Sequence, residues 1–577
     1  MSSNGYQSVY LDHAGAAQPE REQMTKVFEH YCSSNQYGFN FTNPHSSSEA
    51  ESAVDAARSQ VLTFVGADSD QYDVIFTSGA TAAIKLVGES FPISSESIFC
   101  YAKNSHTSVL GLRSLFPRFF CIPSSGLSTS QADTIPLCSC IDRSCCRQCN
   151  CIPANFSSLP DHKNPFFGLI SFPLECNFSG KKNDLKRLAD VVSEILNRQI
   201  TSDVQITDTE HRTHLGDPTQ DLLIDCVDYL SRNTHTTCRW LWLLDVAKFV
   251  GTSPLDLSSL APQKRPHFLS LSFYKIFGYP TGLGALIVRK DALRLMQPKY
   301  FGGGNILAAA ADSDFCVRKP LHSISLFEQG TSHYSGIAAL RFGFDSIARR
   351  GGMKQIQMHT FSLALSFVRL LKELRHSNSF PCYTERLVNW KGDMVEVYGW
   401  SELDKNDGKP SEHNHGSIVS FNLVDSGGHY VPFSDVGRAA IIWGITLRTG
   451  CFCNIGACQE YLQISAEDTV RNYETGRRCG SDDGVGDVIN GRPTGAVRVS
   501  FGASSSLADC EYFIKFLKSV FLDKPGVIEN PVSSSNEISF PRAKEEVPDV
   551  HLHISHIYIY PVKSCAGTSD CHSVSFL

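Results

Sequence analysis

The sequence predicts an α/β protein built on a mainly parallel β-sheet with helices on both faces. Short apolar runs typical of buried strands recur along the first part of the chain. Stretches with helical character lie between them, and strands that alternate with helices indicate a parallel sheet covered on both faces. The strand-like runs are 74–76, 98–101, 166–172, 240–244, 268–272 and 285–288.

Three stretches carry the helical signal. Residues 46–66 place apolar side chains on one helical face, 82–87 follow a strand and a short turn, and 185–196 are amphipathic. The apolar stripe of the first helix consists of Ala50, Ala53, Val54, Ala57, Val61 and Phe64.

Composition limits the class of protein. The chain has 577 residues, 42% hydrophobic and 19% charged, which allows a large core and excludes wholesale disorder. The net charge is −7 and no long Lys/Arg run occurs, so neither nucleic acid nor an anionic membrane is indicated. The first residues lack the basic and apolar regions of a signal peptide, and the strongest apolar run, 439–442, is too short to span a membrane. We therefore expect a cytoplasmic protein.

The 21 cysteines are expected to be mostly reduced thiols, because no secretion signal accompanies them. A cluster at 138–151, CSCIDRSCCRQCNC, falls in a loop-like stretch. Its spacing does not match a CxxC…CxxC zinc pattern, so an insertion is favoured and metal binding is the alternative.

Lys275 stands just past a buried strand, at the start of a glycine-rich turn that ends at Gly284. A buried ammonium is costly unless its pKa falls or the amine is consumed chemically, and a Schiff base with an aldehyde consumes it. Ser272, three residues earlier, could offer a hydroxyl to a phosphate. Most lysines are solvated, so this interpretation depends on the neighbouring motifs.

Asp245 closes the apolar run 240–244, where a carboxylate needs a cationic partner such as a protonated ring nitrogen. A helix N-cap is the alternative. In 77–81, Thr-Ser-Gly-Ala-Thr, glycine allows a tight turn and the free amides of a helix start suit a phosphate. His106 follows the run 98–101, past a strand end where ligands bind in open α/β sheets, although most single histidines are surface or core residues.

Together these residues resemble the fold-type I enzymes that depend on pyridoxal phosphate (PLP), and among them the NifS-like cysteine desulfurases. The resemblance covers about 9–522 and implies a PLP-dependent transferase domain over 1–522. It implies a large subdomain at about 15–330 with the mainly parallel sheet, and a smaller α+β subdomain at about 331–522.

The resemblance implies roles around the cofactor ring. Lys275 would hold PLP as a Schiff base and Asp245 would pair with the ring nitrogen. His106 would stack on the ring, and Asn177 would lie beside the phenolic oxygen.

It also implies a phosphate site made of Gly79, Ala80, Thr81 and Ser272. Thr331, in Phe-Glu-Gln-Gly-Thr, resembles a threonine that reaches the phosphate across a dimer interface, so a homodimer is implied.

The substrate implied is L-cysteine. Arg498 would bind its carboxylate, a role that suits a planar guanidinium. Cys453, in Arg-Thr-Gly-Cys-Phe-Cys, matches the persulfide-forming nucleophile, which must act as a thiolate. Cys451 and Cys458 lie close by, so a zinc site is the alternative, although no fourth ligand is evident nearby.

Two positions depart from plain desulfurases, which have His and Gln where this chain has Tyr274 and Lys248. With Leu-Asp-His-Ala-Gly-Ala at 11–16 and Arg-Thr-Gly-Cys-Phe-Cys-Asn at 448–454, these changes resemble the molybdenum cofactor sulfurases. The implied reaction passes sulfur from L-cysteine, through a Cys453 persulfide, to molybdenum cofactor. Enzymes of the xanthine dehydrogenase and aldehyde oxidase type would thereby be activated.

Two further expectations concern the remainder of the chain. Residues 523–550 are rich in Pro, Ser and Glu and predict a linker. Residues 551–577 resemble the truncated start of the MOSC N-terminal β-barrel of that family. Two other functions stay open, a general cysteine desulfurase for iron–sulfur or thiolation pathways and a truncated, non-catalytic dimer partner.

Overall fold

The structure is a computed structural model that describes residues 8–32, 48–123, 166–197, 238–377, 393–400, 411–480 and 484–523. Its main sheet consists of seven strands: β2 (Tyr72–Thr77), β3 (Ile98–Ala102), β4 (Arg118–Ile122), β5 (Phe166–Pro173), β6 (Cys238–Asp245), β7 (Phe268–Ser272) and β8 (Gly284–Arg289). The order is β2-β8-β7-β6-β5-β3-β4, and β8 alone runs opposite to the other strands of this sheet.

Both faces of this sheet are buried, as expected for parallel strands between helices. Along β6, Trp240, Trp242 and Leu244 belong to one apolar cluster. Leu241 and Leu243, which point to the opposite face, belong to another. The near-continuous apolar character of the strand follows from this double burial.

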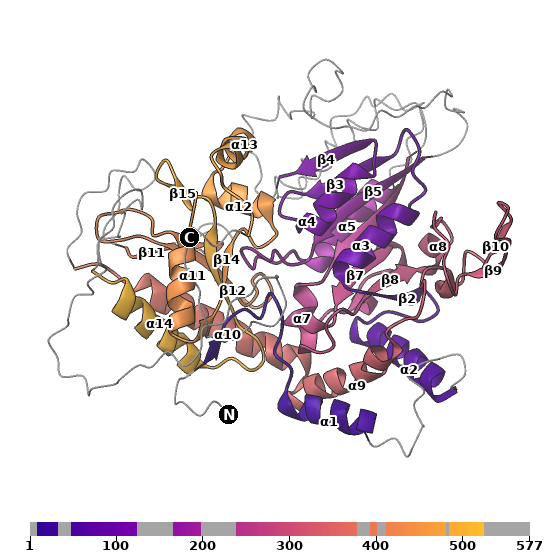
Figure 1. Cartoon of the computed structure of the whole chain (residues 1–577), viewed down its shortest axis with the longest axis horizontal. Coiled ribbons are helices and arrows are strands. Elements are labelled where there is room, and N and C mark those ends of the chain that lie inside the picture. Colours follow the sequence, from indigo (N-terminus) through magenta and orange to yellow (C-terminus); the bar gives the residue numbers. More distant parts are fainter. Residues whose placement is uncertain are drawn as a thin grey trace, which may run out of the picture. The chain divides into compact units, whose positions relative to one another are not determined.

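Helices cover the sheet and continue into a second layer. Helix α3 packs on β7 and β8, α5 on β6, and α2 lies along α9 (Figure 1). The helices that accompany this sheet are α1 (Arg21–Cys32), α2 (Ser48–Phe64), α3 (Ala80–Ser90), α4 (Thr107–Leu110), α5 (Leu185–Asn197), α7 (Tyr274–Phe277), α8 (Lys290–Leu293) and α9 (Tyr334–Arg349).

A second, antiparallel sheet has the order β11-β12-β17-β14. Its strands are β11 (Val395–Tyr398), β12 (Ile418–Leu423), β14 (Arg448–Gly450) and β17 (Ala496–Ser500). The accompanying helices are α10 (Gly352–Lys372), α11 (Phe433–Ile442), α12 (Ile455–Leu462), α13 (Ala466–Glu474) and α14 (Leu507–Val520). Aromatic rings form its core, where Phe367 lies 5.4 Å from Phe513 and 5.5 Å from Phe501 between ring centroids.

Three pairs of short strands complete the described structure. Strand β1 (Val9–Tyr10) pairs in parallel with β13 (Ile445–Thr446), which brings the start of the described chain against its later part. The other two pairs are β9 (Ile306–Ala309) with β10 (Cys316–Arg318) and β15 (Val488–Ile489) with β16 (Arg492–Pro493).

The structure confirms the α/β class and all six strand-like runs, and helices occur at the three stretches with helical character. Strand β4 was not predicted, because at the edge of the sheet most of its residues are only half-buried and give no continuous apolar run. The cysteine cluster 138–151, the linker 523–550 except for its first residue, and the MOSC-like residues 551–577 lie outside the described residues.

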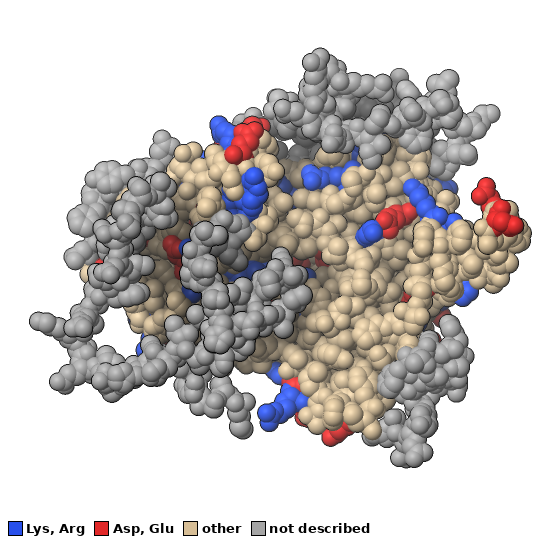
Figure 2. All heavy atoms as spheres, in the orientation of Figure 1, with Lys and Arg blue, Asp and Glu red and all other residues tan. Residues whose placement is uncertain are grey.

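Two surface properties bear on the excluded classes. None of the described helices is long and apolar enough to cross a membrane. On the face shown in Figure 2, acidic and basic side chains of the described residues occur in small mixed groups.

Two glycines meet where the ends of β2 and β7 lie beside the start of β8. Gly79 precedes α3 with a φ of +146°, which disfavours any residue with a Cβ. A Cβ on Gly284 would lie 2.6 Å from the Gly79 Cα and 2.4 Å from the Leu271 carbonyl oxygen. The turn that begins α3 therefore packs directly against backbone.

We expect Gly284→Ala to lower the thermal unfolding midpoint, because the added methyl group overlaps backbone atoms that cannot rotate away. Overpacking of this kind costs about 1–3 kcal/mol. Gly303→Ala is the matched control, since a Cβ there meets no atom within 4 Å. Equal midpoints for Gly284→Ala and Gly303→Ala in scanning fluorimetry would contradict the packing argument.

Candidate active site

A pocket with about 530 Å³ of empty volume, part of it open to solvent, lies at the carboxyl ends of the parallel strands. The structure brings most of the predicted site residues to its wall. Those that line it are Ala80, Thr81, His106, Asn177, Asp245, Ser272 and Lys275.

Lys275 lies in the one-turn helix α7, directly after β7. Burial lowers the pKa of its amine, and the charges of Arg498 and Lys248 lower it further while Asp245 opposes them. Lys275 is therefore biased toward the neutral amine, which is the nucleophilic form.

The start of α3 forms the opposite side of the pocket. The Ala80 backbone N–H donates to the Ser272 hydroxyl at 2.8 Å, and Gly79 lies next to the same hydroxyl. The Thr81 and Ser108 hydroxyls lie 2.7 Å apart. Backbone amides at a helix start, together with hydroxyls, are donors that suit a phosphate.

Asp245 ends β6 and is buried. Its Oδ1 accepts hydrogen bonds from the Ala247 N–H at 3.1 Å and the Ser270 hydroxyl at 3.2 Å. The bond to Ala247 is the local contact that the N-cap alternative expects. Both bonds use one oxygen, so the carboxylate is held in place while Oδ2 takes part in neither.

His106 is the N-cap of α4, and its Nδ1 accepts from the Ser108 backbone N–H at 3.1 Å. Because Nδ1 accepts, the ring hydrogen of the neutral form lies on Nε2. Burial lowers the pKa of His106, and the charge of Lys275 lowers it further against the opposing effect of Asp245. The ring in the pocket is therefore neutral.

The loop that carries Cys453 is strained and held by hydrogen bonds. Phe452 and Cys453 both have a φ of +56°, which side-chain-bearing residues rarely adopt. The Asn177 amide donates to the Phe452 carbonyl at 2.8 Å and accepts from the Asn454 amide at 2.8 Å. The Thr107 N–H donates to the Cys453 carbonyl at 2.8 Å. These bonds join the loop to the wall of the pocket.

The three neighbouring cysteines are not equivalent. Cys451 and Cys458 form a disulfide with their Cα atoms 5.4 Å apart, whereas Cys453 is a free, exposed thiol. This pair departs from the expectation that the thiols are reduced. It also uses two of the three cysteines that the alternative zinc site would have as ligands. Across the described ranges, no group of three or more His, Cys, Asp or Glu side chains is placed to hold a metal ion.

Arg498 on β17 adjoins the same region. Its Nη1 donates to the Asn177 carbonyl at 2.9 Å and its Nη2 to Asp12 Oδ1 at 2.8 Å, and the guanidinium lies 4.8 Å from the Phe452 ring centroid. Asp12 Oδ2 accepts from Arg448 at 3.0 and 2.7 Å. One carboxylate thus fixes two arginines that face each other across β14 and β17.

Not every predicted residue reaches the pocket. Gly79, Thr331, Cys453 and Arg498 do not line it, and Thr331 is exposed in the segment before α9. Sequence reasoning missed Asp12 and Arg448 as site residues, although both lie within the motifs at 11–16 and 448–454. It identified Lys248 only as a departure from plain desulfurases and missed Glu175; both line the pocket.

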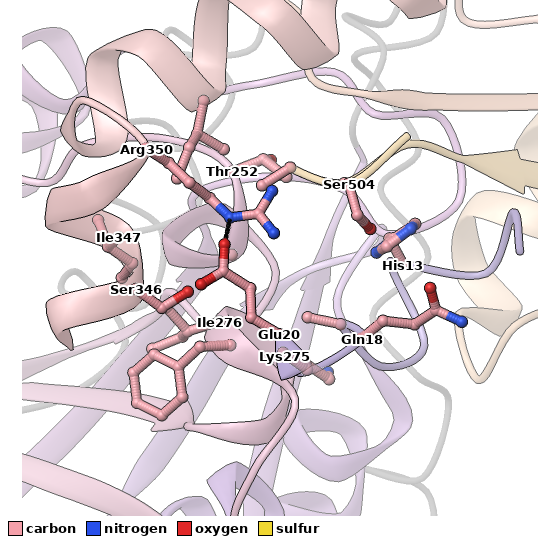
Figure 3. Close-up of a pocket in the computed structure, with 16 residues that line it drawn as sticks. His13, Gln18, Glu20, Thr252, Lys275, Ile276, Ser346, Ile347, Arg350 and Ser504 are labelled. Atoms are coloured by element: carbon pink, nitrogen blue, oxygen red, sulfur yellow. Dashed lines mark hydrogen bonds and ion pairs between the residues drawn. The ribbon is translucent and has the colours of Figure 1, made fainter. Parts of the chain in front are cut away.

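A second pocket, with about 450 Å³ of empty volume, includes Lys275 in its wall (Figure 3). In it the Glu20 carboxylate binds Arg350, and His13 lies on the other side of the space. Burial lowers the pKa of His13 to about 4, with smaller lowering effects of Lys248 and Arg350 opposed by Asp12. Neutral His13 therefore adds no positive charge beside Lys275.

We expect Asp12→Ala to destabilise the protein strongly, because Arg498, 3% exposed, would keep its buried charge without a carboxylate partner. Removing one member of a buried pair costs about 3–5 kcal/mol. Arg448→Gln is the control, since Arg448 is 52% exposed and such a pair contributes at most about 1 kcal/mol. Thermal midpoints of both variants test this; a larger loss in Arg448→Gln would refute the assignment.

The chain is similar to known proteins in sequence. The profile of the aminotransferase class-V family matches residues 9–112 and 223–389. The chain is 36% identical to a molybdenum cofactor sulfurase of Arabidopsis thaliana over 97% of its length, and 35% identical to one of Homo sapiens over 90%. It spans 62% and 50% of the lengths of those two relatives.

The fold is similar to that of a solved structure, the apo cysteine desulfurase of Thermococcus onnurineus. The TM-score is 0.54 at 17% identity, covering 89% of this chain and 94% of the other. Sequence identity and fold agree with the resemblance seen in the motifs. The chain is thus similar to the class-V aminotransferases and, over the part of those relatives that it spans, to the molybdenum cofactor sulfurases.

Proposed function

We propose that this chain is a PLP-dependent sulfurtransferase that removes sulfur from L-cysteine, leaves L-alanine, and delivers the sulfur to molybdenum cofactor. The proposal is supported by the relative positions of Cys453 and Lys275. The free thiol Cys453 sits on a loop bonded to the wall of the pocket that contains the amine of Lys275. An amine in the pocket and a thiol on the adjoining loop are the two nucleophiles that cysteine desulfuration requires.

The pocket fits the cofactor. PLP, when bound, supplies an aldehyde for an amine and a protonated ring that withdraws electrons from the substrate. The absence of a Cβ at Gly79 and the N–H groups at the start of α3 leave space and donors for the phosphate, with Ser272 beside them. The buried carboxylate of Asp245 would hold the proton on the ring nitrogen, and Lys275 would provide the amine.

Substrate binding is assigned to Arg498. Its two terminal nitrogens are held by Asn177 and Asp12, while its buried Nε has no partner among the described residues. A buried donor without a partner is costly, and the carboxylate of cysteine would satisfy it. Asn177 also donates to the Phe452 carbonyl in the loop that carries Cys453, which we call the nucleophile loop. One residue therefore contacts both the proposed carboxylate site and this loop.

The sulfur step uses the chain's own thiol. The thiolate of Cys453 attacks the substrate sulfur, so that a sulfur–sulfur bond forms and the bond between Cβ and sulfur breaks. The electron pair of the broken bond stays with the substrate carbon, which takes a proton and leaves as L-alanine. Cys453 is then a persulfide, and its exposed position suits transfer of the outer sulfur to an acceptor.

Molybdenum cofactor is the acceptor that the names of the relatives support, and enzymes of the xanthine dehydrogenase and aldehyde oxidase type would receive the product. We further propose a cytoplasmic homodimer. In a homodimer, exposed Thr331 would contact the phosphate in the partner's pocket instead of its own. A general cysteine desulfurase and a non-catalytic dimer partner are the outcomes that the following experiment separates.

Cys453→Ser should abolish alanine production from L-cysteine and leave the absorption of bound PLP intact, because serine has a similar shape but is a far weaker nucleophile toward sulfur. Peptide mass spectrometry after addition of L-cysteine should place the persulfide on Cys453. Cys451→Ser is the matched control, because Cys451 is held by Cys458. It should retain most alanine production.

The opposite pattern, with Cys451→Ser inactive and Cys453→Ser active, would exchange their roles. Molybdenum cofactor should take up sulfur only when Cys453 is present. Alanine production without that uptake would favour a general desulfurase, and absence of both in the unaltered chain would favour a non-catalytic partner.

Arg498→Lys should raise the KM for L-cysteine roughly ten- to a hundredfold, because the loss of a charge-assisted hydrogen bond costs about 1.5–3 kcal/mol. Lysine keeps the positive charge opposite Asp12, so the variant tests the geometry of the guanidinium more than its charge. Steady-state kinetics measures the effect. An unchanged KM would place the carboxylate site elsewhere.

A further inference from the structure

The pocket contains a second lysine, Lys248, three residues after Asp245. Its Nζ lies 3.0 Å from Glu175 Oε1 and donates to the Thr252 hydroxyl at 3.1 Å. The side chains of Lys248 and Glu175 are 7% and 0% exposed. A pocket that binds an aldehyde therefore holds two amines, and something must decide which one reacts.

Glu175 and Lys248 form a buried ion pair. A buried carboxylate at 3.0 Å favours the charged form of an amine, and an ammonium has no lone pair with which to attack a carbonyl. The carboxylate is itself confined, because a Cβ on Gly416 would lie only 2.0 Å from Glu175 Oε1. Lys248 is thus a fixed positive charge and not a nucleophile.

Lys275 has the opposite surroundings. No ion pair joins its amine to a carboxylate among the described residues; Asp245, which accepts from Ala247 and Ser270 through Oδ1, raises the pKa of the amine, but burial outweighs this effect. Besides Lys248, the positively charged group that lowers the pKa of Lys275 is Arg498 on β17, which forms an ion pair with Asp12.

Four further titratable groups lie around Lys275. One of them, His13, is neutral because burial lowers its pKa to about 4. His106, before α4, is neutral because burial lowers its pKa. Burial raises the pKa of Tyr274, so this neighbour is neutral as well. Cys453, on the loop that follows β14, acts electrostatically to raise the pKa of the Lys275 amine.

We propose that the Lys248–Glu175 ion pair is a positioning device that selects Lys275 as the reacting amine. The pair removes Lys248 from competition and places a permanent positive charge in the pocket that disfavours a second ammonium at Lys275. The proposal rests on the proposed function only in that Lys275 takes an aldehyde cofactor. Lys248 acts through Lys275 and is not itself a catalytic residue.

Lys182 provides a matched control for the charge. Lys182 is also buried, and its backbone forms an isolated antiparallel bridge with that of Glu175. Its Nζ donates to the Glu412 carbonyl at 2.6 Å. It does not line the pocket. Burial lowers the pKa of Lys182 to about 8, with a further lowering effect of Lys248 opposed by Glu175.

The first experiment follows reattachment of PLP to the full chain after the cofactor has been removed with hydroxylamine. The rate is measured across pH by absorbance, and the modified lysine is identified by peptide mass spectrometry after borohydride reduction. In Lys248→Gln the pH profile should move to higher pH, because Lys275 loses a neighbouring charge that favours its neutral form. Attachment at neutral pH should slow by roughly three- to tenfold.

Lys248→Arg should restore the profile of the unaltered chain, and Lys182→Gln should leave it unchanged. At high pH all variants should reach the same final labelling of Lys275, which shows that the pocket is intact. An unchanged profile in Lys248→Gln, or an equal shift in Lys182→Gln, would overturn the proposal.

A second experiment does not depend on the folding of Lys248→Gln. In Lys275→Ala, borohydride should trap little PLP on Lys248, because Glu175 still holds it as an ammonium. In Lys275→Ala with Glu175→Gln, Lys248 should become the labelled residue. Equal labelling of Lys248 in both variants would overturn the proposal. If the unaltered chain is labelled at a lysine other than Lys275, the proposed function fails in its cofactor assignment, whatever Lys248 does.

Discussion

The carboxylate of Asp12 is the interaction on which the geometry of the site depends. It lies on the N-terminal segment, yet it binds Arg498 on β17 and Arg448 on β14. Without it, two guanidinium groups would face each other across adjacent strands, one of them buried. Since Arg498 also donates to the Asn177 carbonyl, the position of the carboxylate site proposed at Arg498 follows from a residue near the start of the described chain.

The nucleophile loop shows how the structure supports an unfavourable backbone. Two consecutive residues with positive φ cost about 1–3 kcal/mol each. The Asn177 and Thr107 hydrogen bonds, the disulfide beside the loop, and the packing of Phe452 on Phe178, with ring centroids 5.2 Å apart, act against that cost. Cys453 is consequently an exposed residue in a loop whose backbone is held by hydrogen bonds before and after it.

Local patterns were sufficient to predict the large sheet and most of the pocket. Strands buried on both faces give apolar runs, and Lys275, Asp245 and the turn at Gly79 stand at the ends of such runs. The edge strand β4 has no such pattern. The pairing of Cys451 with Cys458 could not be predicted, since three neighbouring cysteines allow three different pairs.

Charge partners were the least predictable feature. The bonds of Asp12 to Arg448 and Arg498 join residues 436 and 486 positions apart, and neither motif alone indicates its partner. The same holds for Lys248, whose departure from the usual residue was visible while its partner Glu175 was not. Ion pairs of this kind are set by tertiary structure, which leaves no local periodicity in the sequence.

The pairing of β1 with β13 has a consequence for the order of folding. Val9 lies opposite Ile445, so the first described strand must wait until nearly the whole described chain has been synthesised. Closing so long a loop carries an entropic cost that only the late contacts offset. The contacts of the N-terminal segment, those of Asp12 with Arg498 and Arg448 included, are therefore expected to form late in folding.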